Sequence, residues 1–170
     1  MLTLERFTFG VGDRFAPQAA AQLRAFQRLA QDGADVIPVW NKSNREHTCI
    51  GSEPQSVYDA AAAAVEKLGW TKPWHVDADH IRLDTVDRFL ACSDFFTIDV
   101  ADSIGQPAAE ADVAAFVERH PELQGNVSVA GLDAPLALSR DMLTAVVRKY
   151  LLAVQDAGRI YRHIAELKGS

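Results

Sequence analysis

Apolar residues alternate along the chain between a period of two, typical of strands, and spacings of three and four, typical of helices. Four short segments rich in aromatic and β-branched residues predict strands at residues 6–11, 35–40, 74–79 and 95–100. Helical spacing fills the intervals between them. One predicted helix opens at Pro17 and closes at Gly33, and the next starts at a capping box of Ser52 and Gln55. A short helix is expected over 85–91.

The later part of the chain reads mainly as helix. A helix is expected over 109–119, ending before a His-Pro pair because the residue before a proline disfavours helical geometry. Residues 126–130 fit either a strand or a turn. A long helix is then predicted from a Ser139 cap to about Lys168.

Repeated strand and helix units predict an α/β fold with a parallel sheet covered by helices. About four units fit part of a (β/α)₈ TIM barrel, and a small open doubly wound sheet is the alternative. A complete barrel needs about 250 residues. We therefore expect the 170 residues to form a single N-terminal part of a TIM-barrel-like catalytic domain, with the later strands absent.

Polar residues follow each predicted strand, and a barrel builds its active site at that edge. The stretch from Trp74 to His80 is the most distinctive, because a strand ends there in an aspartate next to a histidine. Such a pair, Asp79 and His80, suits a metal or proton-transfer site. Asp77 either shares the barrel side with Asp79 or is a turn acid. Residues 41–47 are interpreted as a polar loop with a solvated histidine at its end.

Four segments in order resemble the N-terminal part of the tagaturonate epimerase family: Phe9–Arg14, Pro38–Thr48, Val76–His80 and Phe96–Val100. The resemblance implies an enzyme of hexuronate catabolism that depends on a divalent metal cation and interconverts D-tagaturonate and D-fructuronate. It also implies that Asp79 is the proton acceptor and His80 a metal ligand. The family's glutamate proton donor and two further metal-binding histidines lie on later strands, which have no counterpart in this chain.

The reaction that the resemblance implies inverts a carbon that is not adjacent to the ketone. The two ketouronates differ at a carbon β to the ketone, so one deprotonation beside the ketone cannot invert it. A base that takes the hydroxyl proton and a cation that polarises the ketone would permit retro-aldol cleavage, rotation and re-addition. Transient oxidation would need a nicotinamide, and the sequence lacks a GxGxxG fingerprint. Candidate cations for binding the substrate carboxylate are Arg14, Lys42 and Arg45. Asp99, which ends a strand in a similar way, is a further candidate for binding the substrate.

Composition restricts the partners. A net charge of −6 argues against nucleic acid or an anionic membrane as partner, and no apolar run approaches the ~20 residues of a membrane span. Two cysteines without a CxxC spacing favour a reduced, cytoplasmic protein. Other hypotheses remain: a non-catalytic half-barrel or truncated module, whose open sheet edges would favour a homo-oligomer, and a metal-dependent aldolase-type enzyme on the same fold.

Overall fold

The computed structural model describes residues 4–14 and 18–169 and divides into two compact units. The first unit combines Met1–Asp99 with Ile160–Ser170, and the second is Val100–Arg159. In the first unit the elements are β1 (Thr8–Gly12), α1 (Ala19–Gln31), β2 (Ile37–Ser43), α2 (Asn44–Ile50), α3 (Gln55–Leu68), β3 (His75–Ile81), the 3₁₀ turn η1 (Val86–Arg88) and β4 (Phe95–Ile98). Pro17, expected to open the first helix, lies outside the described residues.

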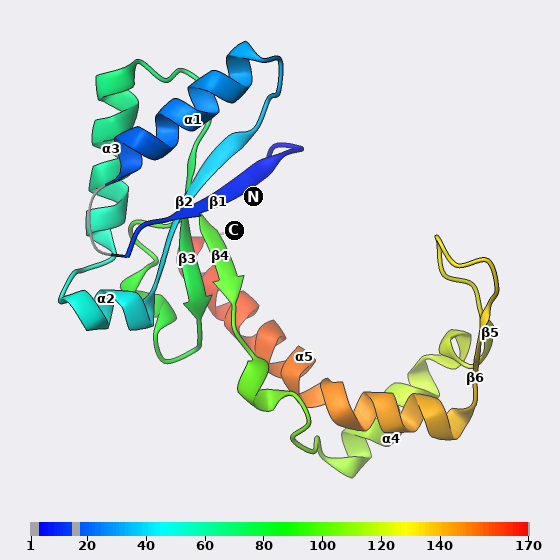
Figure 1. Ribbon diagram of the computed structural model, residues 1–170. Coiled ribbons are helices and arrows are strands. Elements are labelled where there is room, and N and C mark those ends of the chain that lie inside the picture. Colours follow the sequence, from blue (N-terminus) through cyan, green and yellow to red (C-terminus); the bar gives the residue numbers. More distant parts are fainter. Residues whose placement is uncertain (1–3, 15–17, 170) are drawn as a thin grey trace. The chain divides into compact units, whose positions relative to one another are not determined.

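The strands of the first unit form a four-stranded parallel sheet in the order β1-β2-β3-β4 (Figure 1). This confirms the predicted α/β fold with a parallel sheet. Each strand pairs with the one before it in sequence. Because all four strands run parallel, their carboxyl ends and the loops that follow them lie at one edge of the sheet.

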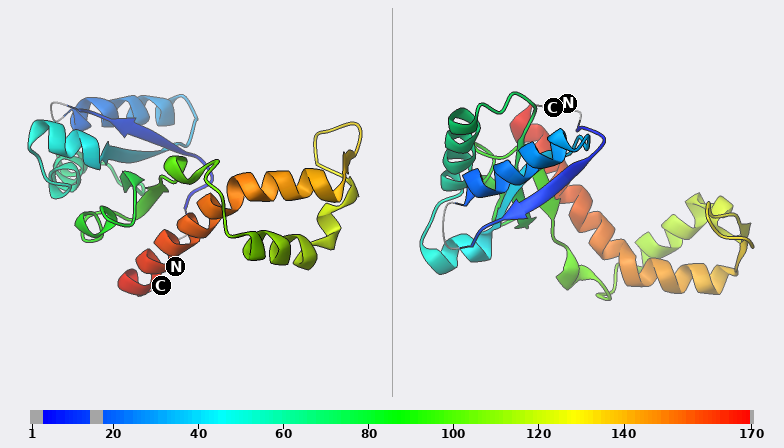
Figure 2. Two further views of the ribbon diagram at one scale, coloured as in Figure 1. Left: turned by 90° about the horizontal axis from the view of Figure 1, so that it is seen from below. Right: turned by 45° about the horizontal axis from the view of Figure 1, so that its top comes forward.

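The helices α1 and α3 lie together on one face of the sheet (Figure 2). Trp40 of β2 and Val76 of β3 are buried against them, among Ala19, Leu23, Phe26, Ala61 and Ala64. The Trp40 indole Nε1 donates a hydrogen bond to Gln22 Oε1 at 3.0 Å. Because side chains alternate along a strand, Asn41 and Asp77 belong to the opposite face.

The polar loop predicted for residues 41–47 is wrong, because β2 extends to Ser43 and a helix, α2, follows at once. Ser43 caps it: its hydroxyl accepts from the Glu46 amide at 3.3 Å, and the Glu46 carboxylate accepts from the Ser43 amide at 3.0 Å. The capping box is therefore at Ser43, and the one predicted at Ser52 is not formed. Pro54 precedes α3 without a side-chain cap.

The short helix predicted over 85–91 is reduced to η1. Thr85 does not cap it, since its hydroxyl accepts from the Arg82 amide at 3.0 Å and so closes the loop after β3. At the end of the chain, Lys168 of α5 (Arg140–Lys168) donates to the carbonyls of Leu90 and Ser93 at 2.8 and 2.7 Å. The last turns of α5 are thereby fastened to the segment between η1 and β4.

The second unit contains η2 (Ala101–Ser103), α4 (Glu110–Arg119), η3 (Pro121–Leu123), β5 (Gly125–Val127), β6 (Leu136–Leu138) and the first part of α5. Its core packs Val113 and Val117 of α4 against Leu143, Val147 and Leu151 of α5. The predicted helices 109–119 and 139–168 are confirmed within a residue or two, and Ser139 accepts from the Met142 amide at 3.2 Å. For residues 126–130, which fit either a strand or a turn, the structure shows that Asn126 and Val127 belong to strand β5 of an antiparallel β5–β6 hairpin.

Candidate functional site

A β-bulge lies where β3 reaches the carboxyl edge of the sheet. The pairing of β3 with β4 shifts register between Ala78 and Ile81. Over this interval β3 contains two residues, Asp79 and His80, where β4 contains one, Thr97. Bulges occur often beside active sites, because the extra residue redirects side chains that a regular ladder would hold.

His80 has a left-handed backbone with φ of 52°, which no other non-glycine residue of the described chain shares. This geometry costs an L-residue about 1–2 kcal/mol. His80 Nδ1 lies 2.7 Å from Asp79 Oδ1, and because a carboxylate only accepts, Nδ1 carries the proton. The His80 side chain is 65% exposed, so its other nitrogen, Nε2, can reach a ligand.

Asp77 lies two residues before Asp79 on the same side of β3. It is buried, and its carboxylate accepts from the Thr97 amide at 3.0 Å and from the Thr97 hydroxyl at 2.8 Å. Burial raises the pKa of Asp77 to about 6, although the hydrogen bonds from Thr97 oppose the rise. Asp77 is thus no turn acid: its side chain binds the strand residue opposite the bulge.

A polar pocket of about 220 Å³ opens at the ends of β2, β3 and β4. It is lined by Ser43, Asn44, Arg45, His80, Arg82, Thr85 and Asp99. The predicted residues His80, Arg45 and Asp99 therefore meet in one place. Arg82 was not predicted, and its Nε and Nη2 lie 3.3 and 3.1 Å from the same Asp99 oxygen. The feature of the sequence that could have identified Arg82 as a site residue is its position directly after the strand β3.

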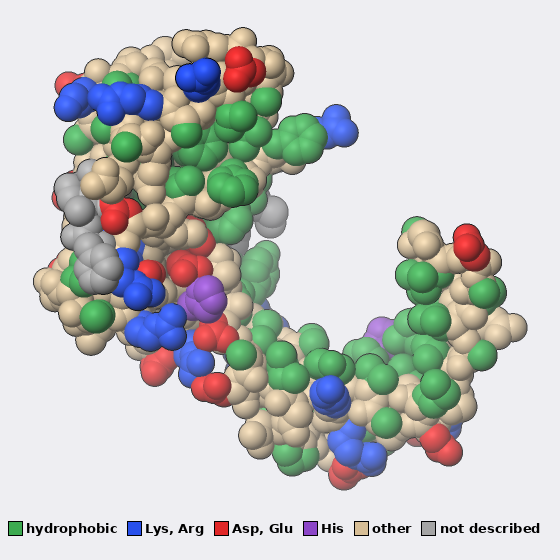
Figure 3. Space-filling model, viewed as in Figure 1, with side chains coloured by type: hydrophobic (Ala, Val, Ile, Leu, Met, Phe, Trp, Pro, Cys, Tyr) green, Lys and Arg blue, Asp and Glu red, His purple; other side chains and the backbone are tan. Residues whose placement is uncertain are grey.

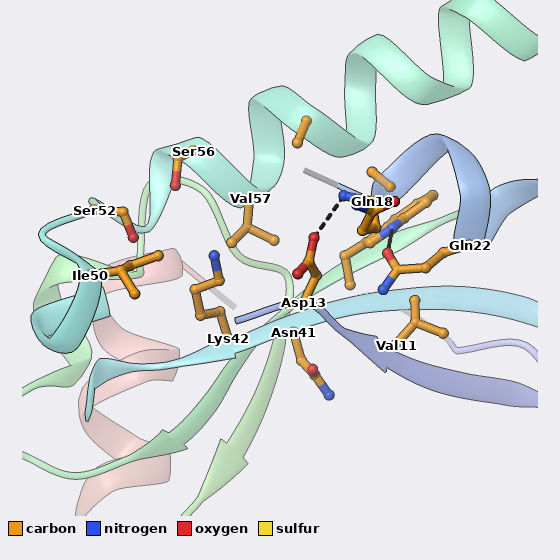
Figure 4. Close-up of a pocket in the computed structure, with 13 residues that line it drawn as sticks. Val11, Asp13, Gln18, Gln22, Asn41, Lys42, Ile50, Ser52, Ser56 and Val57 are labelled. Atoms are coloured by element: carbon orange, nitrogen blue, oxygen red, sulfur yellow. Dashed lines mark hydrogen bonds between the residues drawn. The ribbon is translucent and has the colours of Figure 1, made fainter. Parts of the chain in front are cut away.

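The other two predicted cations lie elsewhere. Arg14 donates to Glu46 at 3.2 Å and so joins the loop after β1 to α2. Lys42 alternates with Ser43 and therefore lies on the helix-covered side of the sheet. Figure 4 shows its ammonium group in a separate pocket, near Ser56 and Val57 of α3.

Two further histidines, His47 and His75, are buried in the first unit. His47, expected in solvent, is fully buried, because α2 turns it inward. Burial lowers the pKa of His47 to about 4, and its Nδ1 lies 2.8 Å from the Ser52 hydroxyl. His75 is also buried, with Glu5 and Asp94 at its two ring nitrogens, which is a structural role.

Among the described residues, His80 is placed to act as a single metal ligand. No group of three or more His, Cys, Asp or Glu in ranges 4–14 and 18–169 could hold a metal ion by itself. His80 nevertheless has the arrangement of a metal-ligating histidine, since the proton on Nδ1 is bound by a carboxylate and Nε2 is left to coordinate. The chain can thus supply one imidazole ligand.

In the described part, no helix has the length and apolar character to cross a membrane.

Comparison with known proteins supports the resemblance. The profile of the UxaE tagaturonate epimerase family matches residues 1–165. The native crystal structure of fructuronate-tagaturonate epimerase UxaE from Cohnella laeviribosi superposes with a TM-score of 0.70 at 25% identity, covering 92% of this chain and 34% of that one. Its complex with two glycerols gives a TM-score of 0.72 at 23% identity, over 96% and 35%.

The chain therefore spans about a third of the length of these solved structures. A search of curated proteins found no match. Because the family profile covers nearly the whole sequence, and the solved epimerases share its fold, this chain belongs to the tagaturonate epimerase family.

Proposed function

We propose that this chain contributes the proton acceptor and one metal ligand to an epimerase that interconverts D-tagaturonate and D-fructuronate. The observation that carries the proposal is the bulge at the end of β3, which places His80 in a polar pocket and the Asp79 carboxylate 2.7 Å from the His80 ring. Strained geometry at a non-glycine residue persists where the surrounding structure demands it, and such positions cluster at active sites. The family match supplies the reaction.

Asp79 is suited to take the hydroxyl proton. Its Oδ1 holds His80, while Oδ2 has no hydrogen-bond partner among the described residues. Removing the proton from the hydroxyl at the β carbon lets the bond to the neighbouring α carbon break. The electron pair then forms an enediolate with the ketone, and the β carbon becomes an aldehyde. After this aldehyde rotates, the bond forms again on its other face and the oxygen is reprotonated.

His80 is suited to hold a divalent cation through Nε2, which would supply Lewis acidity at the substrate ketone. The Asp79 carboxylate fixes the imidazole with its proton on Nδ1. It therefore orients the ligand, and the same carboxylate would take the proton of the substrate hydroxyl. One histidine is an incomplete ligand set, and we propose that further ligands come from later strands of a longer protein.

The strand order supports a partial barrel over the doubly wound alternative. Successive strands are neighbours throughout β1-β2-β3-β4, as in a (β/α)₈ barrel, whereas a doubly wound sheet reverses its order.

Phe9 of the edge strand β1 is 63% exposed. That exposure also favours the competing possibility, a half-barrel that pairs with another chain, and sedimentation of the isolated chain as a stable dimer would support it.

The decisive experiment measures ketouronate interconversion with Mn²⁺, Co²⁺, Ni²⁺ or Zn²⁺. This chain is compared with a protein extended through the coding sequence downstream of it. We expect turnover by the extended protein, its loss in Asp79→Asn and His80→Ala, and normal turnover in the control Asp32→Asn, an exposed acid after α1. An extended protein that is silent with every metal would overturn the proposal. Turnover that survives Asp79→Asn would remove Asp79 as the base.

A further inference from the structure

Four arginines lie around the carboxyl ends of the strands, and they differ in whether a carboxylate of the chain binds them. Three have such a partner: Arg14 with Glu46, Arg82 with Asp99 and Arg88 with Glu53. Arg45 lines the same pocket as His80 and has no ion pair within the part of the chain that the structure describes. Its guanidinium group is therefore available to an anion from outside.

The charge of Arg45 does not serve its own helix. Arg45 is the second residue of α2, directly after Asn44, and lies in the first turn. The positive end of the helix dipole at the N-terminus favours acidic side chains and disfavours cations. The Ser43 capping box holds the backbone in place without help from the arginine. Within the described residues, neither capping nor an ion pair accounts for a cation at this position.

The position of Arg45 relative to the bulge is fixed by the sheet. Ser43, two residues before it, pairs with Asp79 in the ladder between β2 and β3. The first turn of α2 is thus held beside the bulge. Acidic and basic side chains gather around a histidine in this region of the surface, next to α2 and the end of β3 (Figure 3).

Arg82 and Asp99 form the opposite side of the pocket as a neutral pair. Two of the three guanidinium nitrogens of Arg82, Nε and Nη2, contact one oxygen of Asp99, and this pairing cancels most of the charge that either side chain would present. The positive charge that remains in the pocket, apart from any on His80, is that of Arg45. An anionic ligand is therefore attracted toward α2.

We propose that Arg45 binds the carboxylate of the hexuronate and thereby makes the site prefer a sugar acid to the neutral ketose of the same configuration. This inference rests on the proposed function. In a ketouronate only one carbon separates the carboxylate from the carbon that is inverted, so a carboxylate held at α2 leaves the reacting hydroxyl close to the bulge. A guanidinium group suits this role, because its two parallel N–H bonds fix the orientation of a carboxylate as well as its position.

The test compares how tightly charged and neutral ligands bind. D-Tagaturonate and D-tagatose are titrated into the protein, and the ratio of their dissociation constants is measured by NMR. Arg45→Gln should lower the preference for the acid by about tenfold or more, as expected when a hydrogen bond to a charged group is lost. Arg45→Lys should retain part of it, since an ammonium group keeps the charge without the fork. The control Arg24→Gln, an exposed residue of α1, should leave the ratio unchanged.

The outcomes separate this inference from the proposed function. Asp79→Asn should keep the binding preference and lose turnover. If Arg45→Gln keeps the preference while the extended wild-type protein turns over, Arg45 is not the carboxylate-binding group and the proposed function stands. Equal weakening of both ligands would show that Arg45 only shapes the pocket, which refutes the inference. Wild-type protein that neither binds nor converts a ketouronate would refute both.

Discussion

The hydrogen bonds of His75 allow the stability of the first unit to be predicted in detail. Its Nε2 lies 2.8 Å from Glu5 and its Nδ1 lies 2.9 Å from Asp94, so both nitrogens donate to carboxylates. The imidazole side chain is 4% exposed, whereas Glu5 and Asp94 are 31% and 41% exposed. Burial by itself would lower the pKa of His75, but the two carboxylates outweigh it and raise the pKa above 6.5. The two carboxylates favour the doubly protonated ring, which ties Glu5 to β3 and to the turn before β4.

The expected cost of removing these bonds follows from their number and exposure. A hydrogen bond to a charged group contributes ~1.5–3 kcal/mol, and partly exposed partners place each bond near the lower limit. His75→Ala should therefore lower the free energy of unfolding by about 3 kcal/mol or somewhat more, since it also leaves a cavity. His75→Asn, whose amide reaches the Nδ1 position, should keep the bond to Asp94 and lose about half of that.

Urea unfolding followed by tryptophan fluorescence is the appropriate assay. All three tryptophans, Trp40, Trp70 and Trp74, belong to the first unit and report on it alone. Arg148→Gln is the matched control, because it breaks an exposed ion pair with Glu110 in the second unit. It should not move the tryptophan transition.

The pH dependence provides a second test of the same contact. A raised pKa means that the stabilisation is complete below pH 6.5 and is lost as the pH rises through the value in the folded state. The hydrogen bond from His75 lowers the pKa of Glu5 below 4.5, so the contact also weakens as the pH falls through that lowered value. Wild-type protein should lose stability above pH 6.5, and His75→Ala should lose less. If His75→Ala costs under about 0.5 kcal/mol, less than a single hydrogen bond, the reasoning is wrong.

Two further predictions concern the elements that build the site. Ser43→Ala should destabilise the first unit by about 1 kcal/mol in the same assay, because it removes the cap of α2, whereas Glu46→Gln preserves the capping box and should cost less. Equal losses in the two variants would argue against capping. Asp77→Asn can still bind both groups of Thr97 and cannot ionise, so its stability relative to wild type should improve by roughly 2 kcal/mol between pH 3.5 and 7. A pH-independent difference would contradict the raised pKa of Asp77.

The sequence alone determined the elements whose signals are local. The parallel strands, the long helices and the Ser139 cap follow from periodicity and capping chemistry, which need no distant partner. The adjacency of Asp79 and His80 at a strand end was visible for the same reason. Asp99 was likewise expected at the carboxyl edge, and it lies in the pocket with His80.

The tertiary structure determines which of the predicted charged residues lie in the same pocket as His80. Arg14, Lys42 and Arg45 were equivalent in the sequence, yet only Arg45 lines the pocket of His80. Alternation along β2 turns Lys42 to the helix side, and Glu46 of the unpredicted α2 binds Arg14.

The partners of His75 and the register shift that exposes His80 were likewise beyond local analysis. Glu5 meets His75 across 70 positions of sequence, and the bulge depends on how β4 pairs with β3. Contacts between residues distant in sequence form only when the strands assemble. Periodicity therefore predicts the elements of this protein, and their packing determines the environment of each charged group.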